Sequence, residues 1–284
     1  PGRDLVPMLR KLGTKVVAVQ DYWGGELALS WKNPKYRPDA TCVNDTVGKD
    51  LILKAWPDYD PEKIVVTGYP TLSRFSMRGL NGKPKEFYIN QLRKLSGDRP
   101  VILFAGQNQR SGAALMLLVR MLNTLGPRPK LIVREHPRMR TSAPDEVPVW
   151  EEALKLFEGE LLQPDDTWTT EMICAGADLT ISMYSTVLIS AAAMCKPCIA
   201  MLDPDIGGKR FQEAFGGLMD EFPLVTLGCC YKSDSDRQLR GLINNILYAP
   251  RSRGNPLLAA QMQHLLPDAQ SALQIAEVIN KLTS

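Results

Sequence analysis

Two short apolar runs in this chain end abruptly in polar, hydrogen-bonding residues. The first, Leu131–Val133, passes into Arg134-Glu135-His136-Pro137-Arg138, and the second, Ala177–Ile181, passes into Ser182-Met183-Tyr184-Ser185-Thr186. A strand that is buried on both faces of a parallel sheet has such a sequence. Ligands of open α/β sheets bind at the carboxyl ends of these strands. The sequence therefore predicts an α/β fold with a ligand site where these two strands end.

Strand-like and helix-like segments alternate along the rest of the chain. We predict strands at 15–20, 40–44, 63–67, 100–105, 130–134, 161–162, 179–182, 198–202 and 223–227. We predict helices at 5–12, 46–55, 86–95, 114–125, 149–157, 169–175, 186–195, 236–247 and 269–282. The helix at 46–55 has Asp45 as its expected N-cap. Such alternation predicts doubly wound parallel sheets.

The pattern divides the chain into two Rossmann-like domains of unequal size. Residues 1–75 carry three strands, half of a doubly wound domain, so we expect a small or incomplete N-terminal domain there. A stretch rich in Gly, Lys and Pro, 76–85, is the expected linker. Residues 86–250 are expected to form a complete domain, and 251–284 to add closing helices. The last helix would face inward with Ala269, Ala272, Leu273, Ala276 and Ile279.

Composition favours a globular protein that binds a small anion. Of the 284 residues, 44% are hydrophobic and 23% charged, and the net charge is +3. This charge is too small to indicate a nucleic-acid partner. The arginines at 134, 138 and 140 form a local cluster that suits a small anionic ligand better than a long polyanion.

The sequence predicts neither a membrane span nor a disulfide framework. The longest apolar candidate, 189–202, is broken by Lys196-Pro197. Six cysteines are scattered in a chain too large to need disulfides, which favours reduced thiols and a cytoplasmic location. Cys195-Lys196-Pro197-Cys198 has redox-motif spacing, but it leaves a predicted helix instead of starting one, so we read it as structural.

Hydroxyl and basic side chains at the two strand ends are candidate phosphate ligands. Ser182, Ser185 and Thr186 bracket a strand-to-helix turn, where they either bind a phosphate or simply cap the helix. His136 either turns the chain with Pro137 or donates to a phosphate oxygen beside Arg134 or Arg138. A lone histidine is insufficient for a metal site, so no metal is expected.

Two further strand ends carry weaker signals. Gly106 and Gln107 follow the strand at 100–105, where a glycine permits close backbone approach and an amide can donate to a phosphate or sugar. Asp21 ends the first strand beside Tyr22 and Trp23. It is a candidate catalytic base, although these aromatic rings are equally compatible with packing.

Three segments resemble the GT-B superfamily, which includes nucleotide-sugar glycosyltransferases, UDP-N-acetylglucosamine 2-epimerases and CDP-glycerol-type polyol-phosphate transferases. Lys63–Pro70 is similar to the last N-domain strand before the crossover, Arg134–Pro137 to the basic His-Pro strand end, and Ala177–Thr186 to the diphosphate-binding strand and helix start. The resemblance implies that Tyr184 and its neighbours contact a nucleotide-sugar. It also implies transfer of the sugar to an acceptor hydroxyl on a glycan or a lipid-linked molecule, without a cofactor.

Two alternatives stay open at this point. The chain could be an epimerase on the same fold, which would need several carboxylates converging on the sugar. It could also be a non-catalytic nucleotide-sugar-binding protein. Many superfamily members carry an acidic residue for the ribose early in the diphosphate helix, whereas this chain has Leu188-Ile189-Ser190 there.

Overall fold

The structure, a computed structural model, describes residues 5–24, 33–75, 80, 82–215, 217–249, 255–265 and 270–283. Its contacts divide the chain into two compact units. The first unit contains Pro1–Ser76, Phe215–Pro223 and Pro267–Ser284, and the second contains Met77–Ala214 and Leu224–Leu266. The chain therefore returns to the first unit twice after leaving it. Of the expected linker, residues 76–79 and 81 lie outside the described residues, and the next helix begins at Lys85.

The first unit contains a parallel sheet of three strands in the order β1 (Val17–Val19), β2 (Ala40–Val43) and β3 (Ile64–Val66). All three strands were predicted, each slightly too long. Helices α1 (Leu5–Lys11), α2 (Thr46–Ala55) and α13 (Gln270–Thr283) belong to this unit, as do three 3₁₀ turns. The turns are η3 (Pro34–Tyr36), η4 (Pro61–Lys63) and η5 (Pro70–Phe75).

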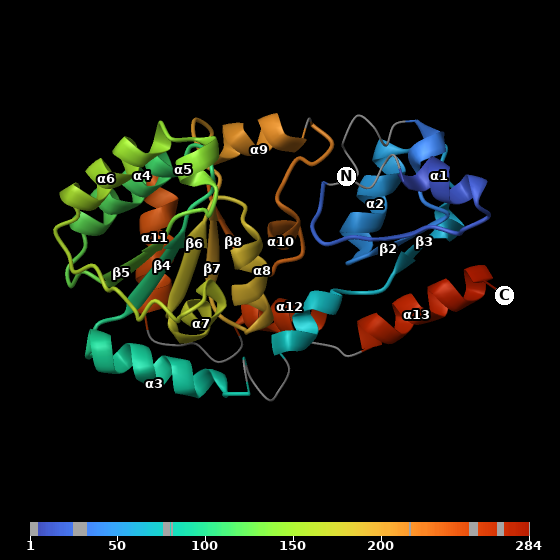
Figure 1. The fold of residues 1–284 in the computed structure, drawn as a ribbon. Helices are drawn as coiled ribbons and strands as arrows, with labels where there is room; N and C mark the ends of the chain where they lie inside the picture. The colour runs from blue at the N-terminus through green and yellow to red at the C-terminus, as the bar shows by residue number, and fades with distance from the viewer. Residues whose placement is uncertain are drawn as a thin grey trace. The chain divides into compact units, whose positions relative to one another are not determined.

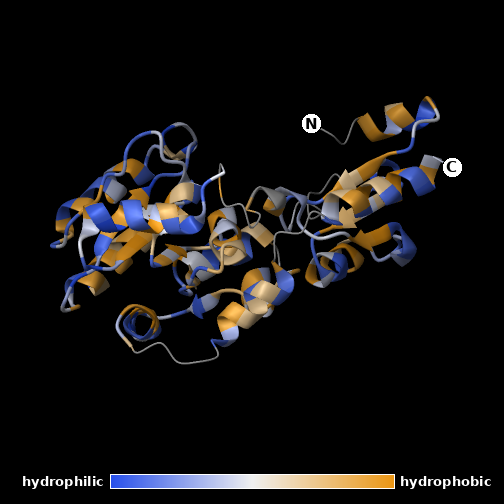
Figure 2. Ribbon diagram, turned by 90° about the horizontal axis from the view of Figure 1, so that it is seen from below, coloured by the Kyte–Doolittle hydropathy of each residue, from blue (hydrophilic) through white to orange (hydrophobic). Residues whose placement is uncertain are grey.

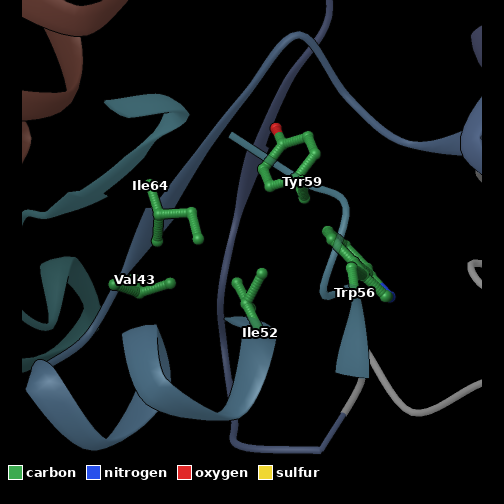
Figure 3. Packing of buried hydrophobic residues seen from close by; sticks show 5 residues of the cluster. All are labelled: Val43, Ile52, Trp56, Tyr59 and Ile64. Atoms are coloured by element: carbon green, nitrogen blue, oxygen red, sulfur yellow. The ribbon is translucent and has the colours of Figure 1, made fainter. Parts of the chain in front are cut away.

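Two helices cover opposite faces of this small sheet, because successive residues of a strand point to opposite sides. On one face Val43 and Ile64 pack with Ile52, Trp56 and Tyr59 (Figure 3). On the other face Ala40 and Cys42 pack against Val278 of α13. The last helix of the chain thus completes the core of the first unit.

The predicted inward face of that last helix is wrong. Leu273 and Ile279 are 59% and 44% exposed, and Ala272 and Ala276 are also exposed. Ala269 lies outside the described residues. The helix instead turns one adjacent stripe toward the sheet, and this stripe consists of Ser271, Ile275, Val278 and Leu282. Both stripes have helical spacing, so periodicity alone could not choose between them.

The second unit contains a parallel sheet of five strands in the order β5-β4-β6-β7-β8. The strands are β4 (Val101–Ala105), β5 (Lys130–Arg134), β6 (Leu179–Ser182), β7 (Cys198–Met201) and β8 (Tyr231–Ser233). The helices are α3 (Lys85–Ser96), α4 (Ser111–Asn123), α5 (Met139–Ser142), α6 (Glu146–Leu156), α7 (Thr170–Gly176), α8 (Thr186–Ala193), α9 (Gly207–Phe215), α10 (Pro223–Thr226), α11 (Asp236–Leu247) and α12 (Pro256–His264).

Helices lie on both faces of the five-stranded sheet (Figure 1). Helix α4 packs against α6 and α11 on one face, while α7 packs against α3 and α8 on the other. Hydrophilic and hydrophobic residues alternate along these helices, as expected where one side meets the sheet and the other meets water (Figure 2). The predicted doubly wound α/β fold is confirmed.

The strand order reverses at β4. The chain passes from β4 to β5 on one side, then returns past β4 to place β6 on the other side. Parallel crossovers are right-handed, so the helices after β4 and β6 leave toward opposite faces. A crevice opens at such a switch point, outside the carboxyl ends of the strands.

The prediction of a strand at 223–227 is wrong, because Pro223–Thr226 forms α10 and the edge strand is Tyr231–Ser233. Short apolar runs fit a strand and a buried helical turn equally well, and proline is tolerated in the first turn of a helix. The predicted strand at 161–162 forms only an isolated bridge between Leu131 and Leu161. Helices α9 and α12 were not predicted.

The six cysteines are free, and all but Cys195 are buried. Burial raises the pKa of the Cys174 thiol to about 12, so this thiol stays protonated at neutral pH. The Cys195–Cys198 segment leaves helix α8 and enters β7, as predicted. Within the described ranges, no helix is both long enough and apolar enough to span a bilayer.

Candidate functional site

The predicted site residues of the second unit meet at one edge of the five-stranded sheet. Ala105 of β4 is in register with Arg134 of β5, and Phe104 is in register with Ile181 of β6. The three loops that follow these strands therefore emerge side by side at the switch point. Ser182 links two of the strands there, because its Oγ donates to the carbonyl oxygen of Ala105 at 2.6 Å.

Two buried polar atoms at this edge have no hydrogen-bond partner among the described residues. They are Nε of Arg134, a donor, and Oε1 of Gln107, an acceptor. The Arg134 guanidinium is already held at Nη2, on the same edge as Nε, because Nη2 donates to the Trp168 carbonyl oxygen at 2.9 Å. Nearly all buried polar groups in proteins are paired, so this donor and acceptor are candidate contacts for an internal water or a bound polar molecule, as are Asn44 Nδ2, Thr67 Oγ1 and Thr180 Oγ1 elsewhere in the described residues.

The hydrogen bond that His136 accepts fixes its proton. Its Nδ1 accepts from the backbone N–H of Arg138 at 3.1 Å, so the neutral ring carries its proton on Nε2. Burial, and then the nearby Arg138 charge, lowers the pKa of His136. The imidazole is therefore neutral at pH 7 and can donate one hydrogen bond through Nε2.

The other basic residues of this strand end differ in their availability. Arg138 is exposed and directly precedes the short helix α5. Arg140 is held by Glu135, since Nε and Nη2 donate to the two carboxylate oxygens at 2.9 and 2.7 Å. A bidentate pair of this kind leaves Arg140 less able to bind a ligand than Arg134 or Arg138.

Helix α8 begins at the switch point with a capped N-terminus. The Oγ of Ser185 accepts from the Val187 N–H at 3.3 Å, which confirms the N-cap reading of this residue. Thr186, the first helical residue, is exposed. Tyr184 is buried against Phe211, with ring centroids 5.5 Å apart, and burial raises the pKa of its phenol to about 12.

The neighbouring helix α4 has its first amides occupied by an internal anion. The Glu146 carboxylate accepts from the N–H groups of Arg110 and Gly112, the latter at 2.9 Å. Gly106 is also needed for packing, because a Cβ there would lie 2.6 Å from the Trp150 ring. The N-terminus of α8 is therefore more accessible to an anion than that of α4. Gly106 is required because Trp150 packs against it.

Asp21, the candidate base, lies in the first unit and is exposed. Asp45 of the same unit is a buried carboxylate, 8% exposed, with several hydrogen-bond donors around it. It accepts from the Trp23 indole at 3.2 Å, from the Tyr69 hydroxyl at 2.5 Å and from the Gly48 N–H at 2.7 Å. The sequence indicated Asp45 only as a helix cap, and nothing in its spacing revealed the two aromatic donors.

Among the residues that the structure describes, no group of His, Cys, Asp and Glu side chains could hold a metal ion. Sequence reasoning also missed three charged residues of the second unit, Arg110, Arg210 and Glu213. Arg110 ends the same loop as Gly106 and Gln107, so its place in the sequence could have revealed it. Arg210 and Glu213 lie on α9, a helix that the apolar pattern did not predict.

No family model matches this sequence, and no curated protein sequence matches it either. Solved structures do match. A putative UDP-N-acetylglucosamine 2-epimerase from Listeria monocytogenes aligns over 97% of this chain and 70% of its own, with 14% identity and a TM-score of 0.61. The UDP-GlcNAc 2-epimerase from Neisseria meningitidis bound to UDP-GlcNAc aligns over 98% of this chain and 79% of its own, with 13% identity and a TM-score of 0.58.

The chain has a GT-B-like fold. The wall teichoic acid polymerase TagF, in a variant soaked with CDPG, also matches, with 15% identity and a TM-score of 0.50. That alignment covers 87% of this chain and 59% of the polymerase chain. The chain thus spans about three fifths of the polymerase it matches. These structures agree with the resemblance to the GT-B superfamily that the sequence indicated.

The lowered pKa of His136 leads to a prediction about stability. Between that pKa and about 6.5, the unfolded chain binds more protons than the folded chain, so stability decreases as pH falls through this window. His136→Gln should give a flatter decrease between pH 7 and pH 5 than the wild-type protein. Urea unfolding at several pH values measures this. Arg138→Gln should also flatten the curve in part, and identical slopes in all three proteins would contradict the assignment.

Proposed function

We propose that the second unit binds the diphosphate of a nucleotide-linked sugar or polyol at its switch point, and that the protein transfers the linked group to an acceptor hydroxyl. The observation that carries the proposal is that two buried polar atoms, Nε of Arg134 and Oε1 of Gln107, have no partner at the ends of the neighbouring strands β5 and β4. A diphosphate oxygen would accept from Nε of Arg134. A sugar or ribose hydroxyl would donate to Gln107.

The chemistry of the site suits a leaving diphosphate. As the bond to the transferred group breaks, negative charge develops on the diphosphate, and fixed donors stabilise it. The Arg134 guanidinium, the Nε2–H of His136, exposed Arg138 and the first amides of α8 are such donors. The hydroxyl of Thr186 could add a hydrogen bond. Asp21 remains our candidate for the base that accepts the proton of the acceptor hydroxyl.

Transfer fits this edge of the sheet better than epimerisation. An epimerase needs carboxylates that converge on the sugar, and two carboxylates that follow β5 are engaged. Glu135 holds Arg140, and Glu146 caps α4. The matched polymerase was soaked with CDPG and one matched epimerase binds UDP-GlcNAc, so both ligand types belong in a binding test. We propose a glycan or a lipid-linked molecule as the acceptor.

The test is thermal stabilisation by UDP, CDP, GDP, ADP and their sugar or polyol conjugates. A ligand that binds only the folded state stabilises it by RT ln(1 + [L]/Kd), about 2.7 kcal/mol at a hundredfold excess over Kd. We expect one base to raise the melting temperature. Arg134→Ala should weaken that binding by about tenfold or more, because a charge-assisted hydrogen bond is lost.

Two further variants sharpen this test. Ser185→Ala should also weaken binding, since it removes the hydroxyl that shapes the start of α8. Arg128→Ala is the matched control, because Arg128 precedes the opposite end of β5 and pairs with Glu158 at 2.6 Å. It should leave nucleotide binding unchanged. If no nucleotide raises the melting temperature of the wild-type protein, the proposed function is wrong.

A further inference from the structure

Two arginines share one carboxylate at the carboxyl end of the same sheet. Arg110, from the loop after β4, lies 3.3 Å from Glu213, with Nη2 facing Oε1. Arg210, one turn before Glu213 on α9, lies 3.5 Å from its other oxygen. Both separations exceed the 2.7–2.9 Å that is typical of a charge-assisted hydrogen bond. The cluster therefore holds two positive charges, one negative charge and no tight pair.

The three charges act on the phenol of Tyr184. Burial is the main cause of its raised pKa, and the charges of Arg210, Glu213 and Arg110 all act on the same hydroxyl. The Tyr184 hydroxyl donates to the backbone carbonyl oxygen of Arg210 at 3.4 Å. Because Tyr184 is the second residue after β6, this cluster lies at the strand end that also leads into Ser185 and α8.

The backbone of Arg110 is held in an unusual conformation. Its φ is 57°, in the left-handed region that residues other than glycine rarely adopt. The Glu146 carboxylate holds it there by accepting from its N–H. From this position the guanidinium reaches α9, and Nη1 donates to the Asp205 carbonyl oxygen at 3.4 Å. Residues in rare backbone conformations cluster at functional sites, so this conformation is consistent with a ligand-binding role for Arg110.

We propose that Arg110 and Arg210 form a second anion subsite, for a phosphoryl group, over Tyr184. In the free protein the Glu213 carboxylate occupies the place of that anion. Guanidinium groups bind phosphate through paired N–H donors, and a dianionic phosphate would neutralise the two arginines better than one carboxylate does. The inference rests on the proposed function in one respect, since the phosphoryl group would belong to the donor or to the acceptor.

The test uses inorganic phosphate and glycerol 3-phosphate as probes in isothermal titration calorimetry. Glu213→Gln removes the internal anion, so it should tighten binding of both probes by roughly three- to tenfold. Arg110→Gln and Arg210→Gln should weaken it by about tenfold. The matched controls are Arg128→Gln and Glu158→Gln, an ion pair at the opposite end of the sheet, and they should change nothing.

The opposite signs separate a binding site from a structural ion pair. If Glu213→Gln does not tighten binding, or Arg110→Gln does not weaken it, the proposed subsite is wrong. Nucleotide binding is measured on the same variants. Nucleotide binding that needs Arg134, together with phosphate binding indifferent to Arg110, would preserve the proposed function and overturn the subsite. Phosphate binding that needs Arg110, without any nucleotide binding, would preserve the subsite and overturn the proposed function.

A competition experiment identifies the source of the phosphoryl group. If saturating nucleoside diphosphate displaces glycerol 3-phosphate from the wild-type protein, the subsite takes a phosphate of the donor. If both bind together, the subsite takes a phosphate carried by the acceptor or by the transferred group. Either result supports the subsite, provided that the glycerol 3-phosphate affinity depends on Arg110 and Arg210.

Discussion

Replacing Asp45 with alanine is expected to lower the free energy of unfolding of the first unit by about 3 to 7 kcal/mol. The buried carboxylate caps α2 and accepts from two aromatic side chains that come from the ends of β1 and β3. Loss of a helix cap costs about 1 kcal/mol. Each buried donor that loses its acceptor costs a further 1–3 kcal/mol.

The reason for so large an effect is that Asp45 joins three strand ends. Trp23 follows β1, Asp45 itself follows β2, and Tyr69 follows β3. The Trp23 ring also contacts Phe222, with centroids 5.9 Å apart, so the cluster includes the segment that returns to this unit in mid-chain. Without the carboxylate, Trp23, Tyr69 and the first turn of α2 lose a shared hydrogen-bond acceptor.

Urea unfolding together with hydrogen exchange of the amides in α2 measures this effect in the first unit separately from the second. The free energy of unfolding of Asp45→Asn should lie between those of the wild-type protein and Asp45→Ala, because asparagine keeps one acceptor oxygen and the shape of the side chain. The matched control is Asp21→Ala. Asp21 is exposed on the same unit, and its loss should change stability by less than about 0.5 kcal/mol. An Asp45→Ala protein within about 1 kcal/mol of the wild type would contradict this account.

The sequence predicted the sheets of this fold well because their signals are local. The strands at 130–134 and 179–182 and the helices at 46–55 and 236–247 have the predicted bounds. Each strand is a short apolar run with polar flanks, and each helix has an N-terminal polar residue and apolar periodicity. The prediction failed at 223–227 because a short apolar run fits both a strand and a helical turn. It failed at 269–282 because the buried face of a helix depends on which element packs against it.

The grouping of the candidate residues at one sheet edge was predictable from the sequence, but their contacts were not. Parallel strands end at one edge, so Gln107, Arg134 and Ser182 could be grouped from sequence alone. What each side chain does there depends on contacts between distant residues. Ser182 holds β4, and Gly106 accommodates Trp150, 44 positions further along the chain. Glu146 and Glu213 act on Arg110 from two different helices, and no spacing rule encodes that.

Replacing Gly207 with alanine is expected to destabilise the second unit strongly. A Cβ at Gly207 would lie 1.9 Å from the backbone carbonyl oxygen of Met201, at the end of β7. Backbone atoms of a central strand cannot give way, so the start of α9 must move instead. Overpacking of this kind costs about 2 to 3 kcal/mol or more. The shift would also loosen the contact of Phe211 with Tyr184.

Two glycines provide a graded comparison for this last prediction. At Gly208 the nearest backbone atom, the Leu202 carbonyl oxygen, would lie 2.7 Å from a Cβ, so Gly208→Ala should cost less than Gly207→Ala. Gly241, within α11, has nothing within 4 Å, and alanine there should raise stability by about 0.5–1 kcal/mol through helix propensity. Urea unfolding ranks the three variants, and hydrogen exchange should be fastest in α9 of Gly207→Ala. If Gly207→Ala is as stable as Gly241→Ala, the start of α9 does not lie against the end of β7. The contacts of α9 with Tyr184, on which the arginine subsite depends, would then also be wrong.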